Sequence, residues 1–321
     1  MKKLLTILLS CALLLCTASA ALAEGDAHLT IAYQYGLAYA PAVVAQTENM
    51  IEKAYADATG GALTVEWVQM SSGADINTGI MSGSVDVGFM GVGPAITGIS
   101  KNVGYKIFTN LSGQEHGLMT NDVAIESYED LVGTDHQIAL VNIGSIQHII
   151  LAKSLADNGY DAHALDANLV AMKHPDGMNA LMTGSLPLHL TTNPYIFRER
   201  ETDGLYEIDE LKEAWPRENS FIVGVAAIDL HDNQPELYAA LCDGIAAGID
   251  YVNGNIEATA ALTSQFDGNT PEDELRYLQM GNYATQTQGV EAMAQFMFEN
   301  GFIEADPGAY ADIVFDNVKG N

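Results

Sequence analysis

Cysteine is nearly absent from this chain of 321 residues, which holds three: Cys11, Cys16 and Cys242. The first two lie in an apolar N-terminal segment, so Cys242 alone remains in the rest of the chain. A single cysteine can form neither an internal disulfide nor a thiolate metal cluster. We therefore expect a fold that is held together by packing, and the sequence indicates no metal site and no cofactor.

Basic residues are also scarce. The 13 lysines and arginines face 42 aspartates and glutamates, which gives a formal net charge of −29. Nucleic acids and anionic membrane surfaces are bound through lysines and arginines that neutralise phosphates, so this balance argues against both kinds of partner. Acidity of this size mainly favours solubility, and it says little about a ligand in a cleft, which has its own local field.

The motifs of common enzymes are missing as well. The eight histidines are scattered without a His-x-x-x-His pair, and no Gly-x-Ser-x-Gly sequence occurs. The Gly91-Val92-Gly93 sequence lacks the third glycine of a dinucleotide fingerprint and the Gly-Lys-Ser/Thr ending of a phosphate-binding loop. We therefore predict that the protein is not an enzyme.

The one long apolar run lies at the N-terminus. Lys2 and Lys3 precede an apolar stretch from Leu4 to Leu15, and Ala21-Leu22-Ala23 follows as a small-x-small cleavage site. This order is typical of a secretory signal peptide, here over residues 1–23, and it predicts export to the periplasm or to the outer face of the cell membrane. A transmembrane anchor is the weaker reading, because the run is short and ends in small residues.

Cys11 offers an alternative use of the same segment. It follows Leu8-Leu9-Ser10, as the lipid-modified cysteine of a bacterial lipoprotein signal does. That reading leaves a very short apolar region, and the Ala-x-Ala site competes with it. A lipid anchor at Cys11 thus stays open beside cleavage after Ala23.

Strands and helices alternate along the remainder of the chain, which predicts an α/β fold with a parallel or mixed sheet covered by helices. We assign residues 24–120 and 230–321 to a first lobe and residues 121–229 to a second. The chain then crosses between the lobes twice, near Thr120 and Leu230, which makes a two-strand hinge. The expected strands cover residues 28–33, 63–69, 85–90, 105–111, 137–142, 169–172 and 221–228, and helices dominate from residue 235 onward.

One phrase occurs twice in the chain. Met81-Ser82-Gly83-Ser84-Val85 is echoed by Met182-Thr183-Gly184-Ser185-Leu186, and each copy is soon followed by a proline, Pro94 or Pro194. In both copies a helical stretch ends at the glycine, which suits the left-handed C′ position, and a short strand follows. One such unit in each half predicts two similar lobes with a ligand between them.

Three turns rich in glycine and serine follow expected strands and precede expected helices. They are Ser71-Ser72-Gly73, Gly91-Val92-Gly93 and Gly144-Ser145. A helix N-terminus presents unpaired N–H groups and a partial positive charge, which suits carboxylates, sulfonates, phosphates and polar neutral groups. Capping alone also explains such turns, but all three fall at the carboxyl end of the sheet, where open α/β folds bind ligands.

Aromatic and amide residues at the same edge complete the predicted site. Tyr35, Gly36 and Tyr39 follow the first strand, where a tyrosine can stack on a ligand. Asn193 and Tyr195 occupy the corresponding loop after the second copy of the repeated phrase.

Charged residues are few near these turns. His148 lies one helical turn beyond Gly144 and can reach the cleft, although packing against the capping turn is the commoner outcome. The predicted segments contain neither lysine nor arginine, and Lys173-His174 is the best nearby cationic pair. Because a strong anion site would ideally offer an arginine fork, the charge of the solute stays open.

The order of these motifs resembles the solute-binding proteins of nitrate/sulfonate/taurine-type ABC importers, which are related to the thiamine-pyrimidine-precursor group. The resemblance covers essentially the whole chain after the signal, and its strength lies in the ordered set. The set comprises Tyr35-Gly36, Ala40-Pro41, Ser71-Ser72-Gly73-Ala74-Asp75, Ser82-Gly83-Ser84-Val85-Asp86-Val87-Gly88, Gly91-Val92-Gly93-Pro94, Asp130-Leu131-Val132-Gly133 and Gly144-Ser145-Ile146-Gln147-His148.

The resemblance implies a type II periplasmic-binding-protein fold, in which two lobes close around a small solute and deliver it to a membrane permease powered by a separate ATPase. The solute is left open among sulfonates, taurine-like zwitterions and pyrimidines. An enzyme of pyrimidine-precursor synthesis is an alternative on the same fold, but that group uses a cysteine-rich iron site that Cys242 alone cannot build. A sensor for a membrane kinase is the other alternative.

The sequence departs from the family pattern at Pro187. Members of the family usually carry an acid at this place in the strand, as Asp86 does in the first copy of the repeated phrase. Since proline cannot donate to a ladder, we predict that the second strand lies at an edge or carries a bulge.

Overall fold

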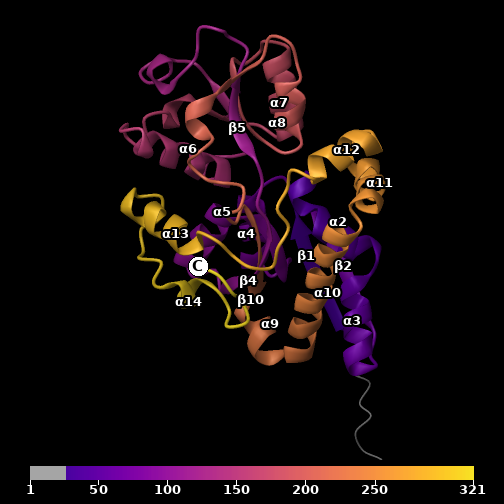
Figure 1. The fold of residues 1–321 in the computed structure, drawn as a ribbon. Helices are drawn as coiled ribbons and strands as arrows, with labels where there is room; N and C mark the ends of the chain where they lie inside the picture. The colour runs from indigo at the N-terminus through magenta and orange to yellow at the C-terminus, as the bar shows by residue number, and fades with distance from the viewer. Residues whose placement is uncertain (1–26) are drawn as a thin grey trace, which may run out of the picture.

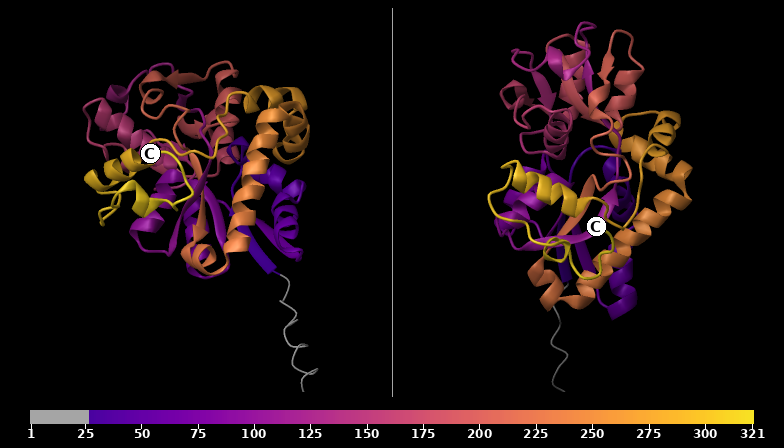
Figure 2. Two further views of the ribbon diagram at one scale, coloured as in Figure 1. Left: turned by 60° about the horizontal axis from the view of Figure 1, so that its bottom comes forward. Right: turned by 60° about the vertical axis from the view of Figure 1, so that its left-hand side comes forward.

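Two five-stranded sheets, each covered by helices, form two lobes that lie one above the other (Figures 1 and 2). The computed structural model describes residues 27–321. The predicted signal peptide over residues 1–23 and Cys11 lie outside the described residues. Within residues 27–321, none of the helices has both the length and the apolar character needed to cross a membrane.

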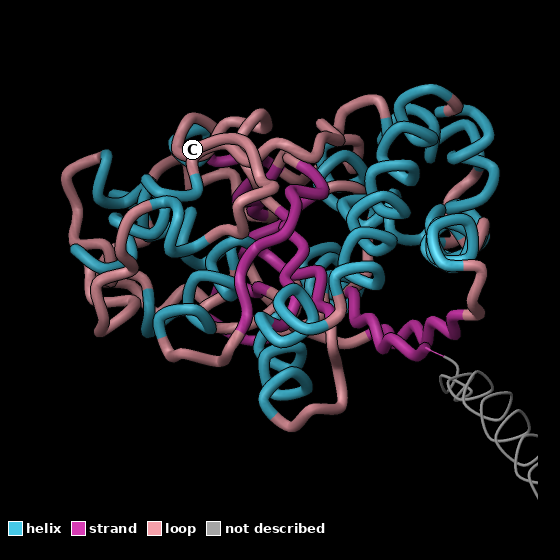
Figure 3. The backbone as a smooth tube through the Cα atoms, turned by 90° about the horizontal axis from the view of Figure 1, so that it is seen from below, coloured by secondary structure: helices cyan, strands magenta, loops and turns pink. Residues whose placement is uncertain are grey.

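The first sheet has the order β2-β1-β3-β10-β4 and is parallel except for β10, which runs antiparallel to both of its neighbours. Helices cover both sides of this sheet, as Figure 3 shows. Its inner strands are therefore apolar on both faces. The strands are β1 (Ala27–Tyr33), β2 (Leu63–Gln69), β3 (Val87–Gly91), β4 (Tyr105–Ser112) and β10 (Ile222–Ala227).

Helices from both ends of the chain pack around this first sheet. The N-terminal set consists of α2 (Ala40–Thr47), α3 (Met50–Thr59), α4 (Gly73–Met81) and α5 (Val92–Ser100). The C-terminal set lies mostly in the part of the chain for which the sequence predicted mainly helices. It consists of α9 (Ile228–Asn233), α10 (Pro235–Gly254), α11 (Ile256–Asp267), α12 (Pro271–Leu278), α13 (Val290–Glu299) and α14 (Tyr310–Ile313).

The second sheet repeats the plan of the first, with the order β7-β6-β8-β5-β9 and one antiparallel strand, β5, in the fourth place. In each sheet the antiparallel strand is the one that enters from the other lobe. The strands are β5 (His116–Thr120), β6 (Ile138–Leu140), β7 (Leu169–Ala171), β8 (Leu188–Thr192) and β9 (Tyr206–Ile208), and the helices are α6 (Ile146–Asp157), α7 (His174–Met182) and α8 (Tyr195–Arg200).

The repeated phrase forms the same helix ending in both lobes. Gly83 after α4 has φ 72° and Gly184 after α7 has φ 73°, the left-handed conformation that glycine adopts without strain. The next N–H reaches back five residues in each case, from Ser84 to the Gly79 carbonyl at 3.0 Å and from Ser185 to the Ala180 carbonyl at 2.9 Å. This is the Schellman ending, and it turns the chain from α4 into β3 and from α7 into β8.

The two crossings between the sheets lie earlier in the chain than Thr120 and Leu230, where we expected them. β5 already pairs with β8 in the second sheet, so the first crossing is the segment 113–115. β10 returns to pair with β3, so the second crossing lies between residues 209 and 221. Strand partners so distant in sequence leave no local signal. The assignment of residues 24–120 and 230–321 to one lobe and of residues 121–229 to the other stays a prediction.

The expectation for Pro187 is wrong. β8 is a central strand between β6 and β5, and its pairing with β5 keeps a regular register. Pro187 lies one residue before β8, where no ladder donor is required. Its carbonyl accepts the Asn121 N–H at 3.1 Å and so extends the pairing from that end.

Candidate functional site

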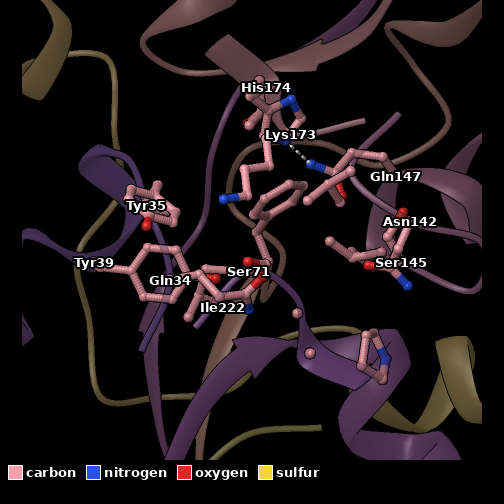
Figure 4. Close-up of a pocket in the computed structure, with 18 of the residues that line it drawn as sticks. Gln34, Tyr35, Tyr39, Ser71, Asn142, Ser145, Gln147, Lys173, His174 and Ile222 are labelled. Atoms are coloured by element: carbon pink, nitrogen blue, oxygen red, sulfur yellow. Dashed lines mark hydrogen bonds between the residues drawn. The ribbon is translucent and has the colours of Figure 1, made fainter. Parts of the chain in front are cut away.

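A pocket of about 610 Å³, including its open mouth, lies between the carboxyl ends of the strands of the two sheets (Figure 4). Its place is the one that open α/β folds use to bind ligands. Both lobes and the returning strand β10 contribute to its wall. The lining residues are Gln34, Tyr35, Ala38, Tyr39, Ser71, Gly73, Gly91, Pro94, Val141, Asn142, Ser145, Ile146, Gln147, Lys173, His174, Pro175, Thr192, Asn193, Phe221 and Ile222.

The first-lobe wall is the N-terminus of α4. Ser72 caps this helix: its Oγ accepts the Asp75 N–H at 3.2 Å and donates to Asp75 Oδ2 at 2.9 Å. Gly73 lets the helix approach α5 closely, because a β-carbon there would lie 2.8 Å from Pro94 Cβ. The N–H groups of the first turn have no partner within the helix, so Ser71 and Gly73 bring a partly positive edge to the pocket.

The second-lobe wall is the N-terminus of α6. Ser145 caps this helix by accepting the His148 N–H at 3.3 Å on its Oγ. Asn142 precedes the cap and Gln147 follows it in the first turn, and both amide side chains line the pocket. The pocket thus has a capped helix N-terminus on each side.

Lys173 supplies the positive charge of the site. Figure 4 shows its side chain reaching into the pocket beside Tyr35, and its Nζ lies 5.8 Å from the centroid of that ring. His174 lines the pocket next to it, but burial lowers the pKa of His174 to about 3, so its ring is neutral. Among the lining residues that the structure describes, none is an aspartate or a glutamate.

Two amide oxygens at the pocket lack hydrogen-bond partners within residues 27–321. Asn193 donates from Nδ2 to Gln114 Oε1 at 2.9 Å and to the Tyr277 carbonyl at 3.0 Å, and its Oδ1 is buried without a partner. Asn142 donates from Nδ2 to the Ile143 carbonyl at 2.7 Å, and its Oδ1 is likewise unpartnered. Because an unpaired buried acceptor is costly, each of these oxygens can accept a hydrogen bond from a solute or from water.

The structure brings together half of the residues that the sequence predicted for the site. The predicted residues in the pocket wall are Tyr35, Tyr39, Ser71, Gly73, Gly91, Ser145 and Asn193. The predicted residues that lie outside the wall are Gly36, Ser72, Val92, Gly93, Gly144, His148 and Tyr195.

The residues outside the wall support it from behind. The Val92 N–H donates to the Phe221 carbonyl at 3.0 Å, and Tyr195 stacks on the ring of His174 with centroids 5.5 Å apart. His148 accepts the Gly144 N–H on Nδ1 at 3.0 Å and contacts Asp166 Oδ1 through Nε2 at 2.9 Å. Burial lowers the pKa of His148, and the residue holds the turn before α6 in place.

The largest omissions of the sequence analysis are Gln147 and Lys173. The sequence marks Lys173 as the nearest cation without assigning it to the site, and Gln147 occurs only as one residue of the Gly144–His148 motif. A signal for Lys173 was present: with Gly83 aligned on Gly184, Lys173 takes the place of Ser72 as the residue before the helix. No comparable signal existed for Gln147, since glutamine in a first helical turn is ordinary.

Two α/β lobes of this topology, joined by two crossings around a pocket, form the fold of periplasmic binding proteins, the class that captures solutes for ABC importers. The chain belongs to the NMT1-like family, whose model matches residues 22–265. The sequence is also 26% identical over 311 residues to the taurine-binding periplasmic protein of Escherichia coli (strain K12), covering 89% of this chain and 91% of that protein.

Solved structures confirm the fold. The alkanesulfonate-binding protein SsuA from Xanthomonas axonopodis pv. citri, bound to MOPS, matches with a TM-score of 0.71 at 14% identity, covering 92% of this chain and 99% of that chain. The periplasmic nitrate-binding protein NrtA from Synechocystis PCC 6803 matches with a TM-score of 0.70 at 14% identity, covering 92% and 86%. The resemblance seen in the motif order is thus confirmed.

Proposed function

We propose that this protein is the exported receptor of an ABC importer and that it binds a small organic sulfonate between its lobes. It would release the solute to a membrane permease that a separate ATPase drives. The family, the taurine-binding relative and the sulfonate-binding structural neighbours support this proposal. The N-terminal segment of residues 1–23, read as a signal peptide, supports export.

The observation that carries the proposal is the charge of the pocket. In a chain of net charge −29, the described wall contains one cation, Lys173, and no carboxylate. The N-termini of α4 and α6 face the same space and add partial positive charge. A unit charge about 4 Å from Lys173 Nζ would gain roughly 4 kcal/mol at the effective dielectric constant of a protein surface.

A sulfonate fits this arrangement better than a neutral heterocycle does. Its three oxygens can accept hydrogen bonds from two helix N-termini and from Lys173 at once. A pyrimidine would stack on Tyr35 and Tyr39 but would leave the Lys173 charge without a counter-charge in a partly enclosed space. The pocket therefore favours a sulfonate over a pyrimidine as its solute.

Thermal unfolding with taurine, ethanesulfonate, nitrate and a pyrimidine carboxamide tests the proposal. A ligand present at a hundred times its dissociation constant adds roughly 2.7 kcal/mol of stability, which moves the melting temperature by several degrees. We expect one or both sulfonates to raise the melting temperature and to show saturable binding by calorimetry. Stabilisation by the pyrimidine alone, or by none of the four compounds, would refute the proposal.

A further inference from the structure

A chain of four polar side chains runs from the pocket wall into the interior of the second lobe. Gln147 Nε2 lies 2.8 Å from His174 Nε2, and His174 Nδ1 lies 3.3 Å from His189 Nε2. His189 Nδ1 lies 2.6 Å from Glu199 Oε1. The residues come from four elements, α6, α7, β8 and α8, and only the first two of them line the pocket.

The inner end of this chain is sealed from water. The side chains of His189 and Glu199 are 0% exposed. The neighbouring Arg200 is committed elsewhere, to Glu207 and Glu115. The two histidine rings are also held in place, since Tyr195 stacks on His174 and the absence of a β-carbon at Gly177 makes room for the His189 ring.

The contacts give the chain a direction. An amide nitrogen can only donate, and Gln147 presents its Nε2 to His174 Nε2, as Figure 4 shows, so that ring nitrogen accepts. His174 is neutral because burial lowers its pKa to about 3, so its single proton is on Nδ1. Nδ1–H of His174 then donates to His189 Nε2, and His189 Nδ1 donates in turn to Glu199 Oε1.

A carboxamide carries its nitrogen and its oxygen on opposite branches, so the oxygen Oε1 of Gln147 is left on the side of the pocket. The unpartnered Oδ1 atoms of Asn142 and Asn193 belong to residues of the same wall. The wall therefore offers the Gln147 oxygen as an acceptor in addition to the cation of Lys173. That combination matches a solute with a negative group and an N–H donor.

We propose that Glu199, acting through His189 and His174, fixes the Gln147 amide with its oxygen toward the pocket and thereby selects an amino-bearing sulfonate over one without an N–H group. Glu199 is a positioning residue, because it does not touch the pocket. The inference rests on the proposed function for the identity of the anion, and the direction of the chain is a separate, measurable property.

Nitrogen-15 NMR of the imidazole rings in the full-length protein without ligand measures that direction. We expect both His174 and His189 to carry their proton on Nδ1. A proton on Nε2 of His174 would overturn the proposal, because the amide nitrogen of Gln147 would then face the pocket. This measurement needs no variant and no bound sulfonate, so it stands even if the proposed function fails.

Competition between taurine and ethanesulfonate measures the selection. We expect the wild-type protein to prefer taurine, and we expect Glu199→Leu to reduce that preference at least tenfold while ethanesulfonate binding is retained. Glu274→Leu is the matched control, since Glu274 is also fully buried but bonds to Asn269 Nδ2, away from the pocket. An unchanged preference in folded Glu199→Leu would refute the proposal.

Gln147→Leu tests the other end of the chain and remains informative if Glu199→Leu does not fold. Removing the oxygen should weaken taurine at least tenfold and should leave ethanesulfonate within threefold. Equal loss for both compounds would contradict the proposal, since the amide would then contribute nothing specific to the amino group. If the wild-type protein binds neither compound, the proposed function is wrong, and the ring protons still decide the direction of the chain.

Discussion

Gly91 at the end of β3 lies directly against Ile146 at the start of α6, so that a β-carbon at Gly91 would come within 2.7 Å of Ile146 Cγ2. The two residues belong to different lobes. A β-carbon at the neighbouring Gly93 would lie 3.1 Å from Cγ1 of Ile149 in the same helix. The absence of side chains at these two glycines thus sets how closely the lobes approach beside the pocket.

Gly91→Val should hold the lobes apart. The added methyl groups cannot be accommodated without moving α6, and overpacking of this kind costs typically 1–3 kcal/mol. We expect small-angle scattering to show less compaction on addition of taurine, and we expect affinity to fall at least tenfold. Gly254→Ala is the control, because no atom lies within 4 Å of its added β-carbon. If Gly91→Val compacts on addition of taurine as much as the wild-type protein does, the lobes do not close through this contact.

Lys173→Met should abolish the preference of the pocket for anions. Methionine keeps much of the apolar stem but removes the charge that lies beside Tyr35. We expect sulfonate affinity to fall by a factor of about 10 to 100, equal to roughly 1.4–2.8 kcal/mol, and we expect calorimetry at low and high salt to show a weaker salt dependence. Lys153→Met is the control, since Lys153 pairs with Asp157 in the same lobe. Equal effects of the two substitutions would exclude a direct role for Lys173.

The sequence predicted the elements better than it predicted their partners. The glycine of the repeated phrase marks a helix ending that depends on local backbone conformation, and the structure has it at both Gly83 and Gly184. The lobe to which β10 belongs depends on pairing with β3 and β4, which lie more than a hundred residues away. No local pattern could specify that choice.

The same distinction applies to the site. Turns such as Ser71-Ser72-Gly73 could be placed at the pocket because each follows a parallel strand and therefore reaches the carboxyl edge of the sheet. Lys173 could have been placed by extending the internal repeat by nine residues toward the N-terminus. The orientation of the Gln147 amide could not be predicted, since it depends on Glu199, three side chains further into the lobe.

Gly113→Ala should damage the crossing between the lobes. A β-carbon there would come within 1.9 Å of the Arg217 carbonyl oxygen and 2.7 Å of the Asn219 carbonyl oxygen, and both atoms belong to the second crossing. Backbone oxygens cannot rotate away as a side chain can, so we expect a loss of at least 1–3 kcal/mol in the free energy of unfolding. Denaturant unfolding measures this. A loss no larger than that of Gly254→Ala would mean that the crossings can separate freely.

His163 should make the contact between the lobes depend on pH. His163 Nε2 lies 2.7 Å from the Asn300 carbonyl that follows α13 in the first lobe, and its Nδ1 lies 2.8 Å from Asp166 Oδ2 in the second. The Asn300 carbonyl, followed by Asp166, raises the pKa of His163, with a smaller contribution from Asp161. Phe302 packs on the ring with centroids 4.6 Å apart.

Because this pKa is raised on folding, the stabilisation is complete below the ordinary histidine pKa and is lost as the pH rises through the raised value. An NMR titration should therefore give His163 a midpoint above the ordinary histidine pKa. Small-angle scattering should show a more open protein above that midpoint, and His163→Gln should remove the dependence. If the His163 midpoint is raised but the shape of the wild-type protein does not change with pH, the contact with Asn300 does not hold the lobes together.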